Sequence, residues 1–216
     1  MTLPSPNFGE RRGGVRPSII VLHYTGMDSC AAARDRLCDP TAEVSAHWLI
    51  SETGKCEQLV DEAQRAWHAG AGEWAGITDV NSHSIGIELA NTGSHPFSEP
   101  QMQALESLLR GIMDRWSIPP ANVIGHSDMA PARKSDPGPK FDWQRLARLG
   151  LAIWPTPSDT SPDPGQFRPM TRNLGYGDHP DDLLLRAFRL RFRPHASGPL
   201  AEDDLRVLAA LAANPR

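Results

Sequence analysis

The sequence predicts an α/β domain followed by a small helical segment. Short apolar runs rich in β-branched residues recur along the first 125 residues, and such runs are typical of buried strands. Segments with helical spacing of apolar residues lie between and after these runs, and this alternation is typical of an α/β fold. Hydrophobic residues make up 39% of the chain and charged residues 22%, which is a globular composition. The runs expected to form strands are 18–22, 46–50, 56–60, 84–89 and 122–125.

Two of these runs are expected to pair with each other. The turn-forming residues 52–55 separate 46–50 from 56–60, so we predict a hairpin there. In the run 84–89 the side chains should alternate between the two faces of the strand. Three apolar residues then share one face, and Glu88 lies on the other face beside Gly86.

The clearest helix is predicted over 99–116, where apolar residues recur at i, i+3 and i+4 spacing. Ser98 stands in the N-cap position, Pro100 suits the first turn, and Gln101 follows three residues after the cap. We therefore expect the helix to begin directly after Ser98. Shorter helices are expected at 31–37, 143–149, 181–192 and 202–213.

The amino-acid composition of the chain changes near residue 154. Proline, serine and aspartate dominate the next dozen residues, which have almost nothing to bury and are typical of a linker. We predict an irregular lead-in over 1–17, an α/β domain over 18–153 that carries the candidate site residues described below, a Pro-rich linker over 154–171 and a small helical module over 172–216.

Charge and hydropathy exclude two classes of function. The formal net charge is −4, which argues against a nucleic-acid binder, since such a protein needs a basic face. No apolar run approaches the roughly 18 residues that a membrane-spanning helix needs. The apolar run that follows the first arginines is also shorter than the roughly 7–15 residues of a secretory signal. We expect a cytoplasmic protein, or an envelope protein if the true start lies upstream.

Three polar residues suggest a metal site. His23 and His126 each follow a short predicted strand, and Asp136 comes ten residues after His126. Strand ends are rigid places from which to present a side chain. Two imidazoles and one carboxylate would leave the fourth tetrahedral position of a zinc ion open, which is the pattern of catalytic sites. Position alone fits scattered surface histidines as well.

Two further residues have chemistry that suits hydrolysis. Glu88, beside a glycine on its strand face, has the character of a general base, although an exposed glutamate is the commoner case. Lys134 stands two residues before Asp136, where a cation would stabilise a developing oxyanion. Considered alone, Lys134 also fits a surface lysine.

Five motifs in order give the chain a resemblance to a known family. The motifs are IVLHYT at 20–25, VSAHWLI at 44–50, RAWHAG at 65–70, NSHSIGIEL at 81–89 and GHSDMAPARKSDPG at 125–138. With them the chain resembles the type 2 N-acetylmuramoyl-L-alanine amidases, the AmpD/AmiD group, related to phage T7 lysozyme and to peptidoglycan recognition proteins. The resemblance covers residues from about 18 to 150.

The resemblance implies a fold, a metal and an activity. The fold would be a central mixed, mainly antiparallel sheet flanked by helices. Zn²⁺ would be bound by His23, His126 and Asp136, with Glu88 as the catalytic glutamate and Lys134 as the stabilising lysine. The implied reaction is hydrolysis of the amide between the N-acetylmuramic acid lactyl group and L-alanine of the stem peptide, in peptidoglycan recycling or turnover. The resemblance further suggests substrate-binding or orienting roles for His47, Trp67, His68, Asn91 and Arg133.

Some relatives carry cysteine as the third ligand, or a tyrosine near the position of Ala46. The Asp136 and Ala46 of this chain match the AmpD-like pattern. We expect a monomer that acts on a muropeptide or on intact peptidoglycan.

Two alternatives stay open. The fold also occurs in proteins that bind peptidoglycan without cutting it. Those proteins lack the third ligand, which favours an enzyme here. The segment 172–216 is similar to a small peptidoglycan-binding module, but it is short enough to be a helical extension docked on the catalytic domain.

Overall fold

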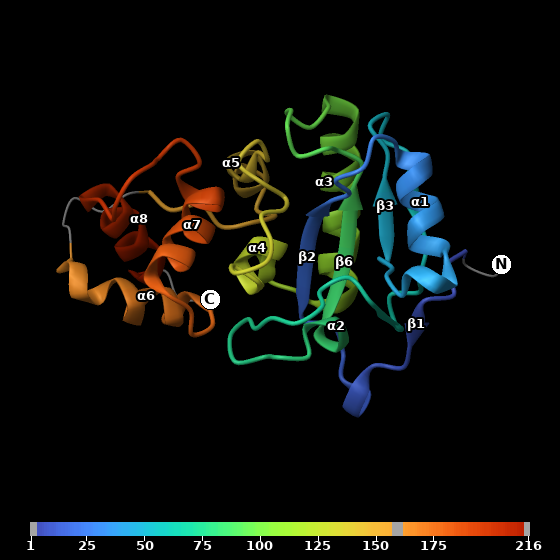
Figure 1. Cartoon of the computed structure of the whole chain (residues 1–216), viewed down its shortest axis with the longest axis horizontal. Helices are drawn as coiled ribbons and strands as arrows, with labels where there is room; N and C mark the ends of the chain where they lie inside the picture. The colour runs from blue at the N-terminus through green and yellow to red at the C-terminus, as the bar shows by residue number, and fades with distance from the viewer. Residues whose placement is uncertain (1–3, 157–161, 214–216) are drawn as a thin grey trace.

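A five-stranded sheet forms the centre of the molecule. The computed structural model describes residues 4–156 and 162–213 (Figure 1). The strand order of the sheet is β4-β3-β6-β2-β7. The strands are β2 (Ile19–Tyr24), β3 (Trp48–Ile50), β4 (Cys56–Gln58), β6 (Ser84–Leu89) and β7 (Val123–Gly125). A separate pair of short strands joins β1 (Phe8–Gly9) to β5 (Arg65–Ala66) in antiparallel register.

The central sheet is mixed, as expected, but it is not mainly antiparallel. β2 pairs in parallel with β6 and with β7, and β3 pairs in parallel with β6. Among the described residues of this sheet, the antiparallel pairing is the predicted hairpin of β3 and β4. The expectation of a mainly antiparallel sheet is therefore wrong. Long connections that contain helices separate β2, β6 and β7 along the chain, and connections of that length allow parallel pairing.

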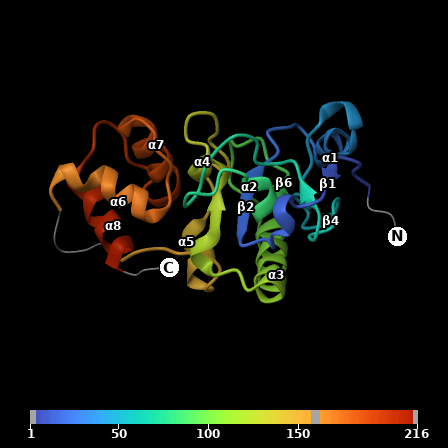
Figure 2. The ribbon, with the colours of Figure 1, turned by 90° about the horizontal axis from the view of Figure 1, so that it is seen from below.

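One face of the sheet packs against the long helix α3 (Glu99–Trp116) (Figure 2). The helix begins where the sequence predicts, because the Ser98 hydroxyl accepts a hydrogen bond from the backbone N–H of Gln101. The apolar residues of β6 that alternation placed together all face this helix and are fully buried. They are Ile85, Ile87 and Leu89.

The opposite face is covered at its two ends. Helix α1 (Cys30–Cys38) packs on the β3 end of the sheet, where Leu37 belongs to one apolar cluster with Leu49. Helix α4 (His126–Met129) and the C-terminal helices cover the β2 and β7 end. The polar ends of β2 and β6 lie between these two covers, and this gap places the candidate site.

Helices α6 (Phe167–Leu174), α7 (Asp181–Phe192) and α8 (Glu202–Ala213) form one end of the molecule (Figure 1). α7 and α8 match the predicted ranges, whereas α6 was missed and spans the end of the expected linker and the start of the expected module. Part of that linker, 157–161, lies outside the described residues. Phe188 of α7 belongs to the same apolar cluster as Val21 of β2, so these helices share a core with the sheet.

The remaining elements are short. None of the helices in the described ranges combines the length and the apolar character that crossing a membrane requires. The short helices are η1 (Arg12–Gly14), η2 (Pro40–Ala42), α2 (Val80–His83), η3 (Pro120–Asn122), α5 (Trp143–Arg148) and η4 (Pro164–Gln166).

Candidate metal and catalytic site

The three residues expected to bind a metal converge at the carboxyl end of β2. The Nδ1 atom of His23 lies 2.9 Å from Nδ1 of His126 and 2.9 Å from Oδ2 of Asp136. The Nδ1 atom of His126 lies 3.1 Å from the same carboxylate oxygen. All three residues are buried, and each offers one ligand atom to a shared point.

The parallel sheet explains why these residues meet. Leu22 of β2 pairs with Gly125, the last residue of β7. His23 follows Leu22 and His126 follows Gly125, so both histidines lie at the same edge of the sheet. His126 is also the first residue of α4, which fixes the direction of its side chain. Asp136 is brought to the edge by a loop whose backbone carbonyl accepts a hydrogen bond from the N–H of Ser127 at 2.9 Å.

The hydrogen bonds around these residues fit a cation. The Nε2 atom of His126 lies 2.8 Å from the carbonyl oxygen of Ala69, which can only accept, so Nε2 carries the proton. The Nδ1 atom of His126 then presents a lone pair toward the Asp136 carboxylate, which is also an acceptor. Converging lone pairs repel each other unless a positive charge lies between them, and a metal ion meets that need.

The protonation states also suit metal binding. Burial and, to a smaller extent, the neighbouring His126 lower the pKa of His23 to about 4, although Asp136 opposes them. Burial alone would raise the pKa of Asp136, but its hydrogen bonds with His126 and His23 hold that pKa below its usual range. At neutral pH the His23 imidazole is therefore neutral and the carboxylate is ionised, which are the forms that bind metals.

Glu88 stands beside the three ligands. It pairs in register with His23 across β2 and β6, so both side chains project from the same face of the sheet. Burial and, to a smaller extent, the charge of Asp136 raise the pKa of Glu88 to about 8, although Lys134 opposes them. Its buried Oε2 atom has no hydrogen-bond partner among the residues that the structure describes. A half-buried carboxyl group of this kind is suited to take up and return a proton near neutral pH.

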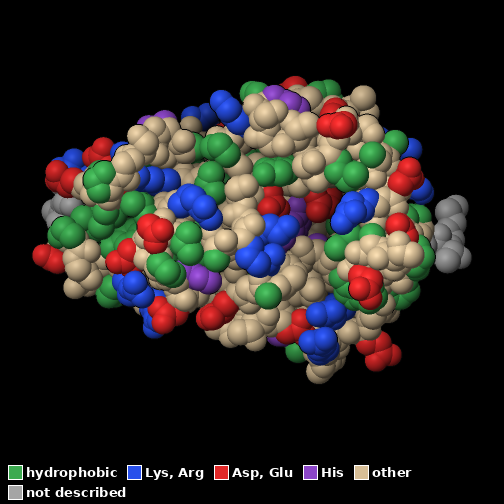
Figure 3. Space-filling view, viewed as in Figure 1, with side chains coloured by type: hydrophobic (Ala, Val, Ile, Leu, Met, Phe, Trp, Pro, Cys, Tyr) green, Lys and Arg blue, Asp and Glu red, His purple; other side chains and the backbone are tan. Residues whose placement is uncertain are grey.

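A pocket of about 380 Å³ opens onto these groups. Figure 3 shows a hollow near the middle of this face, with histidine and acidic side chains inside it and basic side chains at its rim. α1 contributes Arg36 to the lining of the pocket. The predicted site residues that line it are His23, Trp67, His68, Glu88, His126, Arg133, Lys134 and Asp136.

Two residues suggested as substrate-binding lie elsewhere. His47 is 0% exposed, and its Nδ1 accepts a hydrogen bond from the backbone N–H of Gly86. Asn91 is also buried, and its side chain bonds the loop residues Gly93 and His95. The side chains of both residues are used in holding the backbone, so the structure gives neither of them a surface for substrate.

Several residues that support the site were not predicted from the sequence. Ser84 and Asn81 bond the segment 67–70, and Asp128 bonds the backbone N–H of Gly125 at 2.8 Å. All of them lie within the recognised motifs. A pattern of residue types does not show which neighbour a hydroxyl or an amide will reach, so their roles depend on the folded chain.

Comparisons with known proteins agree with this geometry. The family profile described as N-acetylmuramoyl-L-alanine amidase matches residues 13–139. The N-acetylmuramoyl-L-alanine amidase AmiD of Escherichia coli is 35% identical over 90% of this chain and 81% of its own length. The 1,6-anhydro-N-acetylmuramyl-L-alanine amidase AmpD of the same organism is 35% identical over 68% of this chain and 90% of its own.

Solved structures give the same result. AmpDh3 from Pseudomonas aeruginosa aligns with a TM-score of 0.84 at 31% identity, over 99% of this chain and 98% of its own. AmiD in complex with the substrate anhydro-N-acetylmuramic acid-L-Ala-D-γ-Glu-L-Lys aligns with a TM-score of 0.82 at 32% identity, over 96% of this chain and 97% of its own. The chain belongs to the N-acetylmuramoyl-L-alanine amidase family.

Proposed function

We propose that this protein is a zinc-dependent amidase. Its reaction would be hydrolysis of the amide between the lactyl group of N-acetylmuramic acid, or of its 1,6-anhydro form, and the L-alanine of a stem peptide. The observation that carries the proposal is the placement of Glu88 beside three converging ligand residues in an open pocket. The ligand residues are His23, His126 and Asp136.

Zinc suits this donor set. Zinc accepts imidazole nitrogens and carboxylate oxygens as ligands, and three protein ligands leave a position open for reactants. Bound zinc supplies positive charge that polarises a carbonyl group and acidifies water. Magnesium and calcium prefer ligand sets made entirely of oxygen, so they fit these residues less well.

Glu88 would transfer the proton of the attacking water, and Lys134 would stabilise the negative charge on the carbonyl oxygen. Glu88 takes the proton of the attacking water and later gives it to the leaving amine of L-alanine, which its raised pKa favours. Lys134 lines the same pocket and would stabilise the negative charge that develops on the carbonyl oxygen. The products are the muramyl sugar and a free peptide.

The positive rim of the pocket is consistent with a peptide that carries carboxylates. Arg36, Arg133 and Lys134 line the pocket together with Trp67. AmiD has been solved with an anhydro-muramyl tripeptide and AmpDh3 with an anhydromuramic pentapeptide. We propose the same class of muropeptide as the substrate of this chain, with recycling or turnover of peptidoglycan as its role.

Cleavage of a defined muropeptide tests this proposal. The purified protein is incubated with 1,6-anhydro-N-acetylmuramyl tripeptide, and the products are identified by mass spectrometry. We expect free tripeptide and anhydro sugar, no product after treatment with a chelator, and recovery on addition of zinc. Intact sacculi are tested in parallel to compare the polymer with the soluble fragment. Binding of both substrates without any release of peptide would favour the non-catalytic alternative.

We further propose that the C-terminal helices serve mainly to support the catalytic domain. They share an apolar cluster with the sheet, and Arg191 of α7 forms a buried ion pair with Asp128 of α4 at 2.9 Å. A small module joined only by a linker would have a core of its own. The peptidoglycan-binding role expected for 172–216 stays a prediction, as do the monomeric state and the cytoplasmic location.

A further inference from the structure

We propose that the segment 67–70 acts as a clamp that sets the tautomers of both metal-binding histidines. The side chain of His68 would set the tautomer of His23, and the backbone carbonyl of Ala69 would set that of His126. Ser84 and Asn81 hold this segment in place. The inference rests on the proposed metal site, and it assigns positioning roles to residues that had none.

A chain of hydrogen bonds with one possible direction leads to His23. The Ser84 hydroxyl lies 2.6 Å from the carbonyl oxygen of Val80, which only accepts, so the hydroxyl donates its proton there. The oxygen of Ser84 must then accept a hydrogen bond from Nε2–H of His68, which lies 3.1 Å away.

The same logic continues through the imidazole of His68. A neutral imidazole with a proton on Nε2 has a lone pair on Nδ1. The Nδ1 atom of His68 lies 3.0 Å from Nε2 of His23, which must therefore donate. This leaves a lone pair on Nδ1 of His23, the atom that faces His126 and Asp136. The hydroxyl of Ser84 thus decides the tautomer of His23 through His68.

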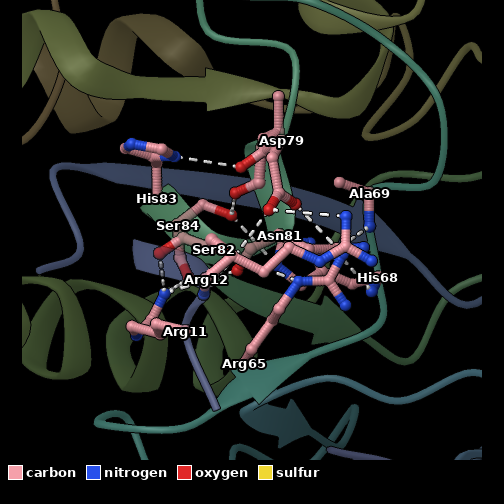
Figure 4. A network of polar contacts seen from close by, with 11 residues as sticks. Arg11, Arg12, Arg65, His68, Ala69, Asp79, Asn81, Ser82, His83 and Ser84 are labelled. Carbon is pink, nitrogen blue, oxygen red and sulfur yellow. Dashed lines mark hydrogen bonds and ion pairs between the residues drawn. The ribbon is translucent and has the colours of Figure 1, made fainter. Parts of the chain in front are cut away.

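The second arm of the clamp reaches His126 through the backbone. The carbonyl of Ala69 accepts a hydrogen bond from Nε2–H of His126 at 2.8 Å, which leaves a lone pair on Nδ1 of that ring also. The amide oxygen of Asn81 accepts from the backbone N–H of His68 at 3.1 Å and of Ala69 at 2.9 Å (Figure 4). The side-chain amide of Asn81 therefore fixes the backbone positions of both His68 and Ala69.

The imidazole of His68 packs directly against Gly86 of β6. A Cβ atom placed on Gly86 would lie 2.4 Å from Cγ of this ring, so the absence of a side chain at Gly86 is what admits it. Groups that orient metal-binding histidines typically change metal affinity 10–100-fold when they are removed. The clamp thus predicts effects on zinc affinity from residues that do not touch the metal.

Two pairs of variants test the clamp in the full-length protein. Ser84→Ala removes the hydroxyl that sets the direction of the hydrogen bonds from Ser84 through His68 to His23, and Ser82→Ala is the control. Ser82 is equally buried and lies in the same neighbourhood, but its hydroxyl bonds Asp79 and not His68 (Figure 4). His68→Leu removes both hydrogen bonds of the ring. His68→Gln keeps an acceptor for His23 and a donor for Ser84, and should rescue the loss.

Zinc dissociation constants are measured by competition with a chromophoric chelator. We expect Ser84→Ala and His68→Leu to bind zinc about 10–100-fold more weakly, and Ser82→Ala and His68→Gln to stay within a few-fold of the unmodified protein. Equal affinities for Ser84→Ala and Ser82→Ala would overturn the proposal. A general loss of folding would instead lower the thermal unfolding temperature of these variants after chelation.

A second readout does not depend on zinc. Long-range ¹H–¹⁵N NMR spectra of the chelated protein report which ring nitrogen carries the proton. We expect His23 to be protonated on Nε2 in the unmodified protein and to become a mixture of tautomers in Ser84→Ala. An unchanged tautomer in Ser84→Ala would refute the clamp. If the unmodified protein bound no zinc, the proposed function would fail while the tautomer measurement would still decide the clamp.

Discussion

Replacement of Arg191 by methionine should destabilise the whole protein and not only its C-terminal helices. The Arg191 side chain is 2% exposed, and its guanidinium donates to Oδ2 of Asp128 at 2.9 Å and to the carbonyl oxygen of Val123 at 3.0 Å. The same guanidinium lies over the ring of Trp143, 4.5 Å from its centre. Asp128 in turn accepts a hydrogen bond from the hydroxyl of Tyr176 at 2.6 Å. These contacts join α7 to the strand and the helix that present His126.

The magnitude follows from what the substitution leaves behind. Methionine keeps most of the apolar stem of Arg191 but removes the charge that neutralises Asp128, which is fully buried. Removing one partner of a buried ion pair typically costs about 3–5 kcal/mol, because the other charge stays buried without compensation. We therefore expect a loss of about 3–5 kcal/mol in the free energy of unfolding of Arg191→Met.

Urea unfolding followed by tryptophan fluorescence measures this loss. Arg206→Met is the control, because the side chain of Arg206 is 37% exposed and pairs with Glu202 one turn earlier on α8. Exposed pairs of that kind contribute well under about 1 kcal/mol. The double variant Arg191→Met/Asp128→Asn should lose less than the sum of the single variants, since it also removes the stranded charge. A loss below about 1 kcal/mol for Arg191→Met would refute the reasoning.

Three further predictions concern the site itself. Gly86→Ala should lose about 1–3 kcal/mol of unfolding free energy, because its Cβ would collide with His68. Gly9→Ala is the control in urea unfolding, because there is open space around Gly9. Equal stabilities of the two variants would contradict the reasoning. In the chelated protein, unfolding free energy should fall relative to Glu88→Gln as pH rises from 4.5 toward about 8, by about 1.4 kcal/mol per pH unit. The unfolded chain loses the Glu88 proton first, so the folded form is penalised, and parallel pH profiles would show that the pKa of Glu88 is not raised. Lys134→Met should lower kcat by about 10²–10³ with unchanged zinc content, and near-normal turnover would exclude an oxyanion role.

The elements predicted well are those whose local pattern is strong. Helix α3 has the bounds expected from its periodicity and from the Ser98 cap. The strand β6 also has its expected bounds, since five of its six residues are buried and leave little ambiguity. Helix α6 was missed because it follows the Pro-rich segment, is short and contains Pro169. The mainly antiparallel sheet was inferred from the family resemblance, and local sequence patterns could not correct it because they do not show the direction in which strands pair.

The candidate site was predictable where strand ends mark it. His23 and His126 follow β-branched runs, and the parallel register of β2 and β7 explains why they meet. The supporting residues were not predictable in this way. Ser84 and His68 are 16 residues apart and Asp128 and Arg191 are 63 apart, so their contacts arise only when the chain has folded.

Zinc content and turnover of the Glu88→Gln variant together test the proposed function most directly. Glutamine has the shape of glutamate but cannot accept the proton of the attacking water at neutral pH. We predict one zinc per chain by elemental analysis in both the unmodified protein and the variant. Release of peptide from anhydro-muramyl tripeptide should occur with the unmodified protein and fall by at least about 10²-fold in the variant. A variant that holds zinc and cleaves at a near-normal rate would contradict the role given to Glu88, and an unmodified protein that holds zinc without cleaving would contradict the amidase itself.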